Sequence, residues 1–334
     1  MPPVRVGVWG VGAWGEKHAR VYHALDRADL VGIHDAIPDR AREVADRYGC
    51  AAFPTPEALL AACEAVSIAV PTAGHRAALE RAASAGRHAL VEKPMAASLE
   101  DADAMLAAAS GAGIVLQVGH VERFNPALTA ARPHLKNPKF VEAHRLALFQ
   151  PRSLDIDVVF DLMVHDLDIV LDLVGSPPVK ISAVGVAVLS GSEDIANARL
   201  EFPDGCVANL TASRVSQDRL RRIRFFQDDA YLSVDLFGRT CELLRMDRAG
   251  LAAASRRGRP LEAIQKQALA VEGGEPLTLE LDAFLASIAR GVSAPPRGAA
   301  TGAAGREALR VAAEVQGALR QRARQWATRA STVS

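Results

Sequence analysis

A glycine-rich turn near the N-terminus constrains the fold of this chain more than any other feature. The apolar run Val4 to Trp9 is followed by Gly10-Val11-Gly12-Ala13-Trp14-Gly15 and then by a helical pattern from Glu16 to Leu25. This order of strand, glycine turn and helix is typical of a dinucleotide site: the first glycine permits the turn, the second lets the backbone approach the pyrophosphate, and the third lets helix and strand pack closely. The helix N-terminus then attracts the phosphates.

A carboxylate follows at the place where such a site contacts ribose. A second apolar strand, Leu30 to His34, ends in Asp35, which lies 20 residues beyond Gly15. Its oxygens can accept hydrogen bonds from ribose hydroxyls, whereas a 2′-phosphate would bring a like charge into the same space. Residues 36–38 supply no compensating cation, and Arg40 lies inside the next predicted helix. A glycine-rich motif alone also occurs in flexible loops, but this combination predicts NAD as the cofactor.

Length and composition bound the remaining possibilities. The chain has 334 residues, more than one hydrophobic core usually supports, so two domains are expected. Its 39 basic and 39 acidic residues form no basic stripe, which favours a small-molecule partner over nucleic acid or an anionic membrane. No apolar run reaches about 18 residues, and no signal peptide precedes the first strand. A soluble, cytoplasmic protein is therefore predicted.

The four cysteines are scattered along the chain without CxxC or metal-ligand spacing: Cys50, Cys63, Cys206 and Cys241. Such usage fits a reducing compartment. We interpret these residues as packing residues and expect no metal site.

Two patterns of secondary structure divide the chain. Up to about Val121 strands alternate with helices, which predicts a doubly wound parallel α/β sheet over residues 1–121. From Lys139 to Val271 most segments have the pattern of consecutive strands, and Pro203-Asp204-Gly205 between two of them is a hairpin signal. Residues 122–334 are therefore predicted to form a second α/β domain with a mostly antiparallel sheet, which also includes helices near 125–135, 157–174, 277–290 and 305–327.

Polar side chains follow three strands of the predicted parallel sheet, at the edge where ligands of such sheets bind. They are Thr72 and His75 after one strand, Glu92 and Lys93 after another, and Gln117 and His120 after the last. Pro71, which begins the first of these loops, is also a candidate cofactor-binding residue. Lys93 precedes Pro94, which keeps the lysine backbone out of the α region and fixes how it leaves its strand. An exposed loop lysine is often only a solvated charge, but this position favours a role in the site.

A second candidate group lies in the helical segment Asp157 to Val174, where four polar residues recur at helical spacing: Asp161, His165, Asp168 and Asp172. Asp161 and His165 are four residues apart, so the carboxylate can orient the imidazole as a general base. For Asp168 and Asp172 we expect the plainer arrangement, in which the polar stripe faces water. Metal binding lacks support because no other ligand cluster accompanies them.

The motifs together resemble a known family. The glycine turn, Pro71 with His75, the Glu92-Lys93-Pro94 triplet and the Asp161-x-x-x-His165 pair are similar to the glucose-fructose oxidoreductase / inositol dehydrogenase (Gfo/Idh/MocA) family. This resemblance covers nearly the whole chain. It implies a Rossmann domain joined to a domain with an open antiparallel sheet, the nicotinamide held between them, and Lys93 and His165 meeting the sugar's reacting carbinol.

Two longer segments resemble one branch of that family, the dehydrogenases of nucleotide-linked N-acetyl sugars that include UDP-N-acetylglucosamine 3-dehydrogenase. They are residues 117–126 and 155–166. The resemblance implies a UDP-sugar substrate contacted also by His120, Arg123 and Asn125, and a cofactor site that includes Glu92 and Gln117. It further implies a homo-oligomer, dimer or tetramer, formed through the antiparallel sheet, and an aminotransferase that uses the 3-keto product for lipid A.

The predicted mechanism is oxidation of a sugar hydroxyl. His165, oriented by Asp161, takes the hydroxyl proton while Lys93 stabilises the developing negative charge, although the sequence leaves open which of Lys93 and His165 is the formal base. Other substrates remain open, namely UDP-N-acetylglucosaminuronate or a free polyol such as inositol. A rival from another class is a non-catalytic NAD-sensing regulator, which would not need the lysine and the histidine.

Overall fold

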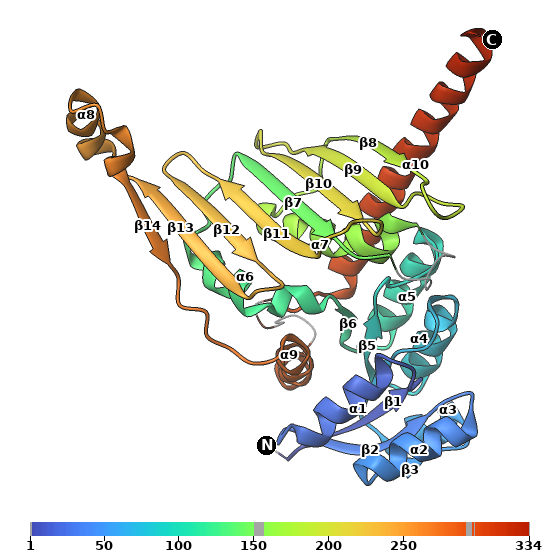
Figure 1. The fold of residues 1–334 in the computed structure, drawn as a ribbon. Helices are drawn as coiled ribbons and strands as arrows, with labels where there is room; N and C mark the ends of the chain where they lie inside the picture. The colour runs from blue at the N-terminus through green and yellow to red at the C-terminus, as the bar shows by residue number, and fades with distance from the viewer. Residues whose placement is uncertain (1, 150–156, 292–295, 297, 334) are drawn as a thin grey trace. The chain divides into compact units, whose positions relative to one another are not determined.

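The structure is a computed structural model that describes residues 2–149, 157–291, 296 and 298–333. Its contacts divide the chain into two compact units, Met1–Phe124 with Gly274–Leu309, and Asn125–Gly273 with Arg310–Ser334 (Figure 1). The predicted domains end at different places, because residues 274–309 pack with the first unit; the roles given to these domains stay predictions. Asp155 and Ile156 of the second sequence motif lie outside the described residues.

The first unit is built on a parallel sheet of six strands in the order β3-β2-β1-β4-β5-β6. The strands are β1 (Val4–Trp9), β2 (Ala28–His34), β3 (Ala51–Ala52), β4 (Ala65–Ile68), β5 (His88–Glu92) and β6 (Leu116–Gly119). This is the strand order of a Rossmann fold, whose ligands bind at the carboxyl ends of the strands. The predicted doubly wound parallel sheet is confirmed.

Helices connect these strands: α1 (Gly15–Ala24), α2 (Pro38–Tyr48), α3 (Pro56–Ala62), α4 (His75–Ser84) and α5 (Leu99–Gly111). The sequence sets where several begin. Proline occupies the first turn of α2 and α3, where its missing N–H has no helical partner. The Ser98 hydroxyl caps α5 by accepting from the Asp101 N–H at 3.1 Å.

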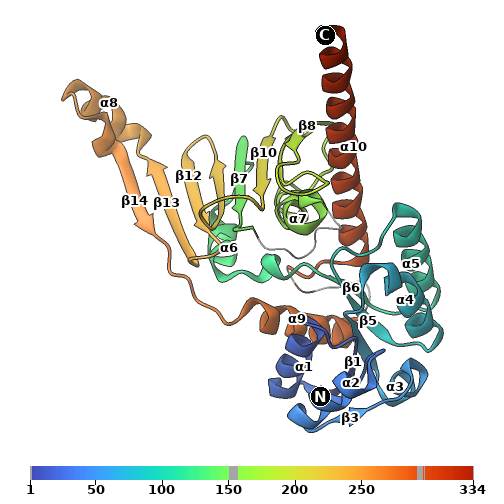
Figure 2. The same cartoon turned by 45° about the vertical axis from the view of Figure 1, so that its right-hand side comes forward.

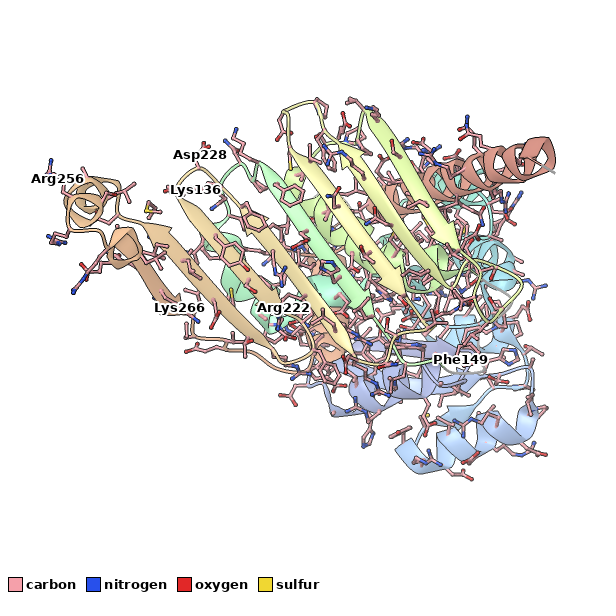
Figure 3. All side chains as sticks on the ribbon, turned by 45° about the horizontal axis from the view of Figure 1, so that its top comes forward. Lys136, Phe149, Arg222, Asp228, Arg256 and Lys266 are labelled. Atoms are coloured by element: carbon pink, nitrogen blue, oxygen red, sulfur yellow. The ribbon has the colours of Figure 1, made fainter. Side chains whose placement is uncertain are left out.

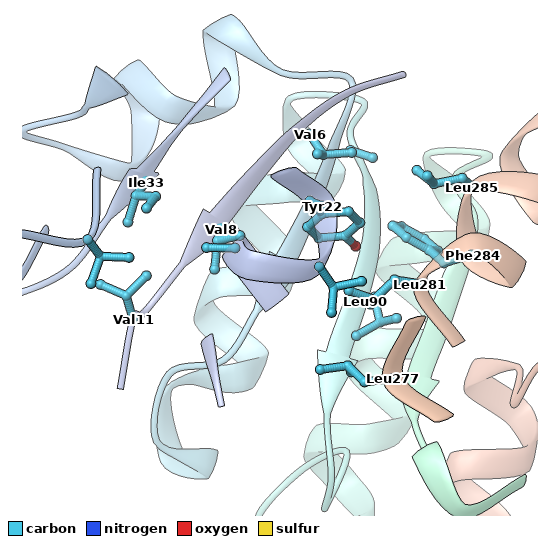
Figure 4. Packing of buried hydrophobic residues seen from close by; sticks show 14 of the residues in the cluster. Val6, Val8, Val11, Tyr22, Ile33, Leu90, Leu277, Leu281, Phe284 and Leu285 are labelled. Carbon is cyan, nitrogen blue, oxygen red and sulfur yellow. The ribbon is translucent and has the colours of Figure 1, made fainter. Parts of the chain in front are cut away.

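A helix from late in the chain completes the core of the first unit. Four apolar residues of α9 (Pro276–Arg290), namely Leu277, Leu281, Phe284 and Leu285, are buried in the same cluster as Val6 and Val8 of β1 and Tyr22 of α1 (Figure 4). Their spacing of three and four residues places them on one face of the helix. The Rossmann unit is therefore made from two separate stretches of sequence.

The second unit contains an eight-stranded sheet in the order β14-β13-β12-β11-β7-β10-β9-β8. The strands are β7 (Phe140–Leu146), β8 (Lys180–Val186), β9 (Ile195–Glu201), β10 (Val207–Ser213), β11 (Leu220–Phe226), β12 (Ala230–Asp235), β13 (Thr240–Met246) and β14 (Ile264–Ala268). Only β7 and β10 pair in parallel. The predicted hairpin is present between β9 and β10, where Gly205 has a φ of 84°. The mostly antiparallel sheet is confirmed.

The second sheet has one covered face. The helices of this unit are α6 (Pro126–Ala131), α7 (Val164–Val174), α8 (Arg248–Arg256) and the part of α10 (Gly302–Val333) that follows Leu309. α6 contacts β12 and β13, α7 contacts β7 and β10, and both helices lie on the same face of the sheet (Figure 2). Side chains along β7 alternate accordingly, with Val141 and Ala143 buried and the residues between them partly exposed. No helix in the described ranges is long and apolar enough to cross a membrane.

The cysteines behave as core residues. Cys63, Cys206 and Cys241 are buried and Cys50 is partly buried, and all are free thiols. Burial raises the pKa of each of these thiols to about 11, so they stay protonated at neutral pH. Their interpretation as packing residues is confirmed.

Candidate active site

The glycine turn between β1 and α1 has the geometry that a pyrophosphate needs. Gly10 has a φ of +85°, and a Cβ on Gly15 would lie 1.8 Å from the Gly10 carbonyl oxygen, so larger residues fit at neither position. A Cβ on Gly12 would meet no atom within 4 Å. Gly12, Ala13 and Trp14 are exposed, and no side chain caps α1. The backbone is therefore open to an anion at the helix N-terminus, which fits the predicted cofactor.

Asp35 is fixed beside this turn. Its carboxylate accepts hydrogen bonds from the N–H of Val11 at 2.7 Å and from the N–H of Ile37 at 2.8 Å. A carboxylate offers about four lone-pair positions, so acceptor capacity remains for ribose hydroxyls. The turn and the predicted ribose ligand thus form one rigid part of the surface.

The loop after β4 is braced by His75. The imidazole is buried, with Nε2 2.9 Å from the Val70 carbonyl oxygen and Nδ1 3.1 Å from that of Pro94. Burial lowers the pKa of His75, against the opposing effect of the neighbouring carbonyl groups. His75 therefore joins the loops after β4 and β5, and its role in cofactor binding, like those of Pro71 and Thr72 at the start of this loop, stays a prediction.

Glu92 and Lys93 at the end of β5 depend on a residue that the sequence analysis missed. His18 of α1 is fully buried, and its Nε2 lies 2.9 Å from Oε1 of Glu92. The other oxygen of Glu92 accepts from the Lys93 N–H at 3.2 Å. Burial opposes ionisation of Glu92, but the contacts with His18 and Lys93 outweigh it and lower the pKa of this carboxyl. Glu92 thus anchors the backbone of Lys93, and direct binding of cofactor by Glu92 stays a prediction.

The polar residues after β6 are buried. Gln117 is 2% exposed, and its side-chain N–H group donates to the Glu280 carbonyl oxygen of α9 at 3.4 Å. His120 and Arg123 are also buried. Glu280 was missed by the sequence analysis, although it lies on the inward face of α9, next to Leu281. The predicted contacts of Gln117, His120 and Arg123 with ligands stay predictions.

In the second unit, the helix that carries Asp161 and His165 begins with an irregular turn. Asp157 accepts hydrogen bonds at Oδ1 from the N–H groups of Val159 at 2.9 Å and Phe160 at 3.2 Å. Residues Val159–Met163 then form a π-helical turn before α7. Turns of this kind are frequent at functional sites. Asp161 and His165 are both partly buried there, and the predicted contact between them stays a prediction.

The prediction that Asp168 and Asp172 face water is wrong. Asp168 is 1% exposed, and Asp172 pairs with Arg132 at 2.6 Å. Their neighbour Asp166, 3% exposed, accepts two hydrogen bonds from Arg145 of β7, at 2.9 and 2.8 Å. The helical spacing was identified correctly, but this part of the helix packs against protein: Asp168 is buried, and arginines from other elements supply the opposite charge for Asp172 and Asp166.

Asn125, the predicted substrate contact at the start of the second unit, has structural partners. Its side-chain oxygen caps α6 by accepting from the Ala127 N–H at 3.1 Å, and its amide donates to the Leu236 carbonyl oxygen at 2.9 Å. Binding of substrate by Asn125 stays a prediction.

Comparison with known proteins identifies the family. The model of an oxidoreductase family with an NAD-binding Rossmann fold matches residues 4–120, and the model of the GFO/IDH/MocA C-terminal domain matches residues 136–233. The chain belongs to the Gfo/Idh/MocA family of oxidoreductases. The resemblance inferred from the motifs is confirmed, as is the NAD-binding Rossmann domain.

Individual relatives are similar over most of the chain. UDP-N-acetylglucosamine 3-dehydrogenase of Acidithiobacillus ferrooxidans is 42% identical over 86% of this chain and 89% of its own length. A solved structure of that enzyme aligns with a TM-score of 0.85 at 40% identity, covering 96% of this chain and 98% of the other. Inositol 2-dehydrogenase of Rhizobium meliloti is 30% identical over 63% of this chain and 69% of its own length.

Proposed function

We propose that this protein is an NAD-dependent dehydrogenase that oxidises the 3-hydroxyl of UDP-N-acetylglucosamine to a 3-keto sugar. The observation that carries the proposal is the 42% identity to UDP-N-acetylglucosamine 3-dehydrogenase over 86% of this chain. That similarity extends beyond the Rossmann unit into the second unit, for which the sequence predicts substrate binding. The relative named for inositol is less similar and matches a smaller part of the chain.

The proposed chemistry divides between the two units. The glycine turn and Asp35 would hold NAD, which would supply a hydride acceptor for carbon 3 of the sugar. His165, oriented by Asp161, accepts the hydroxyl proton, and Lys93 donates a hydrogen bond to the same oxygen as its negative charge develops. A positioned base contributes about 10² to 10⁴ in rate, and a positioned donor to the developing charge about 10² to 10³. The anchoring of Lys93 through Glu92 and His18 supports this role, because it limits how the lysine backbone can move.

Formation of NADH tests the proposal. The protein is offered NAD with UDP-N-acetylglucosamine, UDP-N-acetylglucosaminuronate, inositol and glucose in parallel, and absorbance at 340 nm is followed. We expect turnover with UDP-N-acetylglucosamine and at least a hundredfold lower kcat/KM with inositol and glucose. Preference for inositol or for the uronate would overturn the substrate assignment. Binding of NAD without turnover of any sugar would instead favour the NAD-sensing regulator.

We also propose two partners. The 3-keto product carries a carbonyl that an aminotransferase can convert to a 3-amino sugar, so an enzyme of that class would consume it. The second partner is another copy of this chain, bound through the sheet face opposite α6 and α7, on which Arg222 and Lys266 lie (Figure 3). Three aromatic residues adjoin one another in this sheet without being buried: Phe140, Phe226 and Tyr231, with ring centroids 5.5 and 4.9 Å apart in sequence order. Light scattering on the wild type and on Tyr231→Arg tests this, and a wild-type monomer would contradict it.

A further inference from the structure

Four charged residues form a closed ring beside the glycine turn. Glu16 lies in the first turn of α1, and three residues of α2 face it: Arg40, Glu43 and Arg47. Arg40 contacts Glu16 and, at 2.9 Å, Glu43. Arg47 also contacts Glu16 and, at 2.8 Å, Glu43. We call these four residues the glutamate–arginine ring; each arginine contacts both glutamates, so the ring is neutral.

Arg40 connects this ring to the ribose site. Its Nε donates to the Val11 carbonyl oxygen at 3.0 Å, while the N–H of the same residue donates to Asp35 at 2.7 Å. The guanidinium and the Asp35 carboxylate therefore hold one residue of the glycine turn from its two sides. The Arg40 side chain is 28% exposed, so it lies at the surface beside the turn residue that Asp35 also contacts.

The ring and the glycine turn together contact every nitrogen of the Arg40 guanidinium. Nε contacts Val11, Nη1 contacts Glu43 and Nη2 contacts Glu16. An arginine offers five N–H donors in a fixed plane and binds phosphate best when two of its nitrogens are available together. In this chain each terminal nitrogen already donates to a glutamate, so a 2′-phosphate would have to compete with two carboxylates for Arg40.

We propose that Glu16 and Glu43 are specificity-determining residues that make the site select NAD over NADP. They act through Arg40: both carboxylates pair with its guanidinium, so its charge and its terminal nitrogens are already engaged and a ribose 2′-phosphate gains little from it. This inference rests on the NAD-binding function of the family and does not depend on which sugar is oxidised. It assigns the cofactor preference to side chains outside the ribose contact itself.

Binding titrations of the full-length protein without sugar substrate test the proposal. The variants are Glu16→Gln, Glu43→Gln and their combination, which preserve side-chain size and remove charge. Asp46→Asn is the matched control, because it removes one exposed carboxylate from the same helix outside the ring. The probes are NAD and NADP, and the smaller pair 5′-AMP and 2′,5′-ADP, which isolates the 2′-phosphate. Calorimetry gives each affinity at low and at physiological salt, and thermal unfolding is recorded in parallel.

We expect the NADP-to-NAD affinity ratio of the double variant to rise about tenfold, with a smaller rise in each single variant and none in Asp46→Asn. The rise should be larger at low salt because charges carry it. Adding Arg40→Met to the double variant should remove most of the gain. An unchanged ratio with a lower unfolding temperature would show that the ring only joins α1 to α2, and would overturn the proposal. A gain that survives Arg40→Met would refute the part assigned to Arg40. These titrations contain no sugar, so the expected affinities stay the same even if the protein proves to oxidise another sugar.

Discussion

The two units fix their candidate functional residues in different ways. In the first unit most of the contacts come from the backbone: N–H groups donate to Asp35 and Glu92, and carbonyl oxygens lie next to the His75 imidazole. In the second unit arginines neutralise the acidic residues near His165, with Arg145 on Asp166 and Arg132 on Asp172.

A further buried pair in the second unit follows the same pattern. Arg214 contacts Asp194 at 2.8 Å, and the aspartate also accepts from the N–H groups of Leu189 and Ser190. Burial opposes ionisation of Asp194. The hydrogen bond from the Ser190 hydroxyl, together with the contacts from the two N–H groups and Arg214, outweighs burial and holds the pKa of Asp194 well below its usual range. The comparison teaches that a contact with the backbone needs only one particular side chain, whereas a buried charge pair needs two side chains of opposite charge. Removing one member of a buried charge pair should therefore lower the free energy of unfolding more than removing a side chain that contacts only the backbone.

The largest expected effect follows from breaking a buried charge pair. Replacing Arg145, which is 2% exposed, by methionine leaves Asp166 buried without its counter-charge. We expect the free energy of unfolding to fall by about 3 to 5 kcal/mol. Lys180→Met is the control, because the Lys180–Glu201 pair is exposed and screened by solvent, so its loss should lower the free energy of unfolding far less. Denaturant titration measures both, and similar losses in the two variants would contradict the comparison.

The next prediction concerns His165 in the second unit. His165→Asn should lower kcat by a factor on the order of 10² or more and remove the pH dependence that an imidazole near neutrality imposes. The free energy of unfolding should change little, since the ion pairs around the helix remain. Activity is measured between about pH 5 and 9. An unchanged pH–rate profile would mean that His165 is only structural.

A variant at Lys93 separates catalysis from stability in the first unit. Lys93→Met removes the side-chain charge and leaves the backbone N–H that Glu92 holds. Turnover should fall by about 10² or more, while NAD affinity and stability stay near wild type. Steady-state kinetics, NAD titration and thermal unfolding provide the three readouts. Full activity in this variant would remove Lys93 from the mechanism.

Two glycines of the turn separate folding from cofactor binding. Gly15→Ala places a Cβ against the Gly10 carbonyl oxygen and should cost about 1 to 3 kcal/mol of stability. Gly12→Ala meets open space, so stability should stay constant while NAD affinity falls. Denaturant unfolding measures the stability of both variants, and titration with NAD measures their cofactor affinity. A stable Gly15→Ala variant would show that the turn can relax.

The smallest expected effect concerns Asp35. The wild type should bind NAD at least tenfold more tightly than NADP, a difference of about 1.4 kcal/mol. Asp35→Ser should narrow that gap by weakening NAD and by relieving the repulsion of a 2′-phosphate. Titration with both cofactors is the measurement. Equal binding by the wild type, or no change on substitution, would show that Asp35 does not contact the ribose.

Features that follow from local sequence were predictable, and features that depend on distant partners were not. The strand, glycine turn and helix, and the position of Asp35, follow from chain order and from backbone conformations that only glycine adopts readily. His18 was missed although its place on the inward face of α1, four residues before Tyr22, was a usable signal. The burial of Asp168 could not be predicted, because helical spacing shows which residues share a face but not what covers it.

The position of α9 means that the core of the first unit cannot be completed until late in synthesis. Val6 and Val8 of β1 are made before Leu281 and Phe284, which belong to the same core but follow the long segment Asn125–Gly273. At about 5 to 20 residues per second, a ribosome needs roughly 7 to 30 s to make that segment. During this interval the nascent Rossmann sheet lacks the helix that covers one of its apolar sides, and such exposed surface favours aggregation. A gene fragment that ends at Phe124 would carry the same defect permanently, so expression of the nucleotide-binding half requires residues 274–309 to be joined to it.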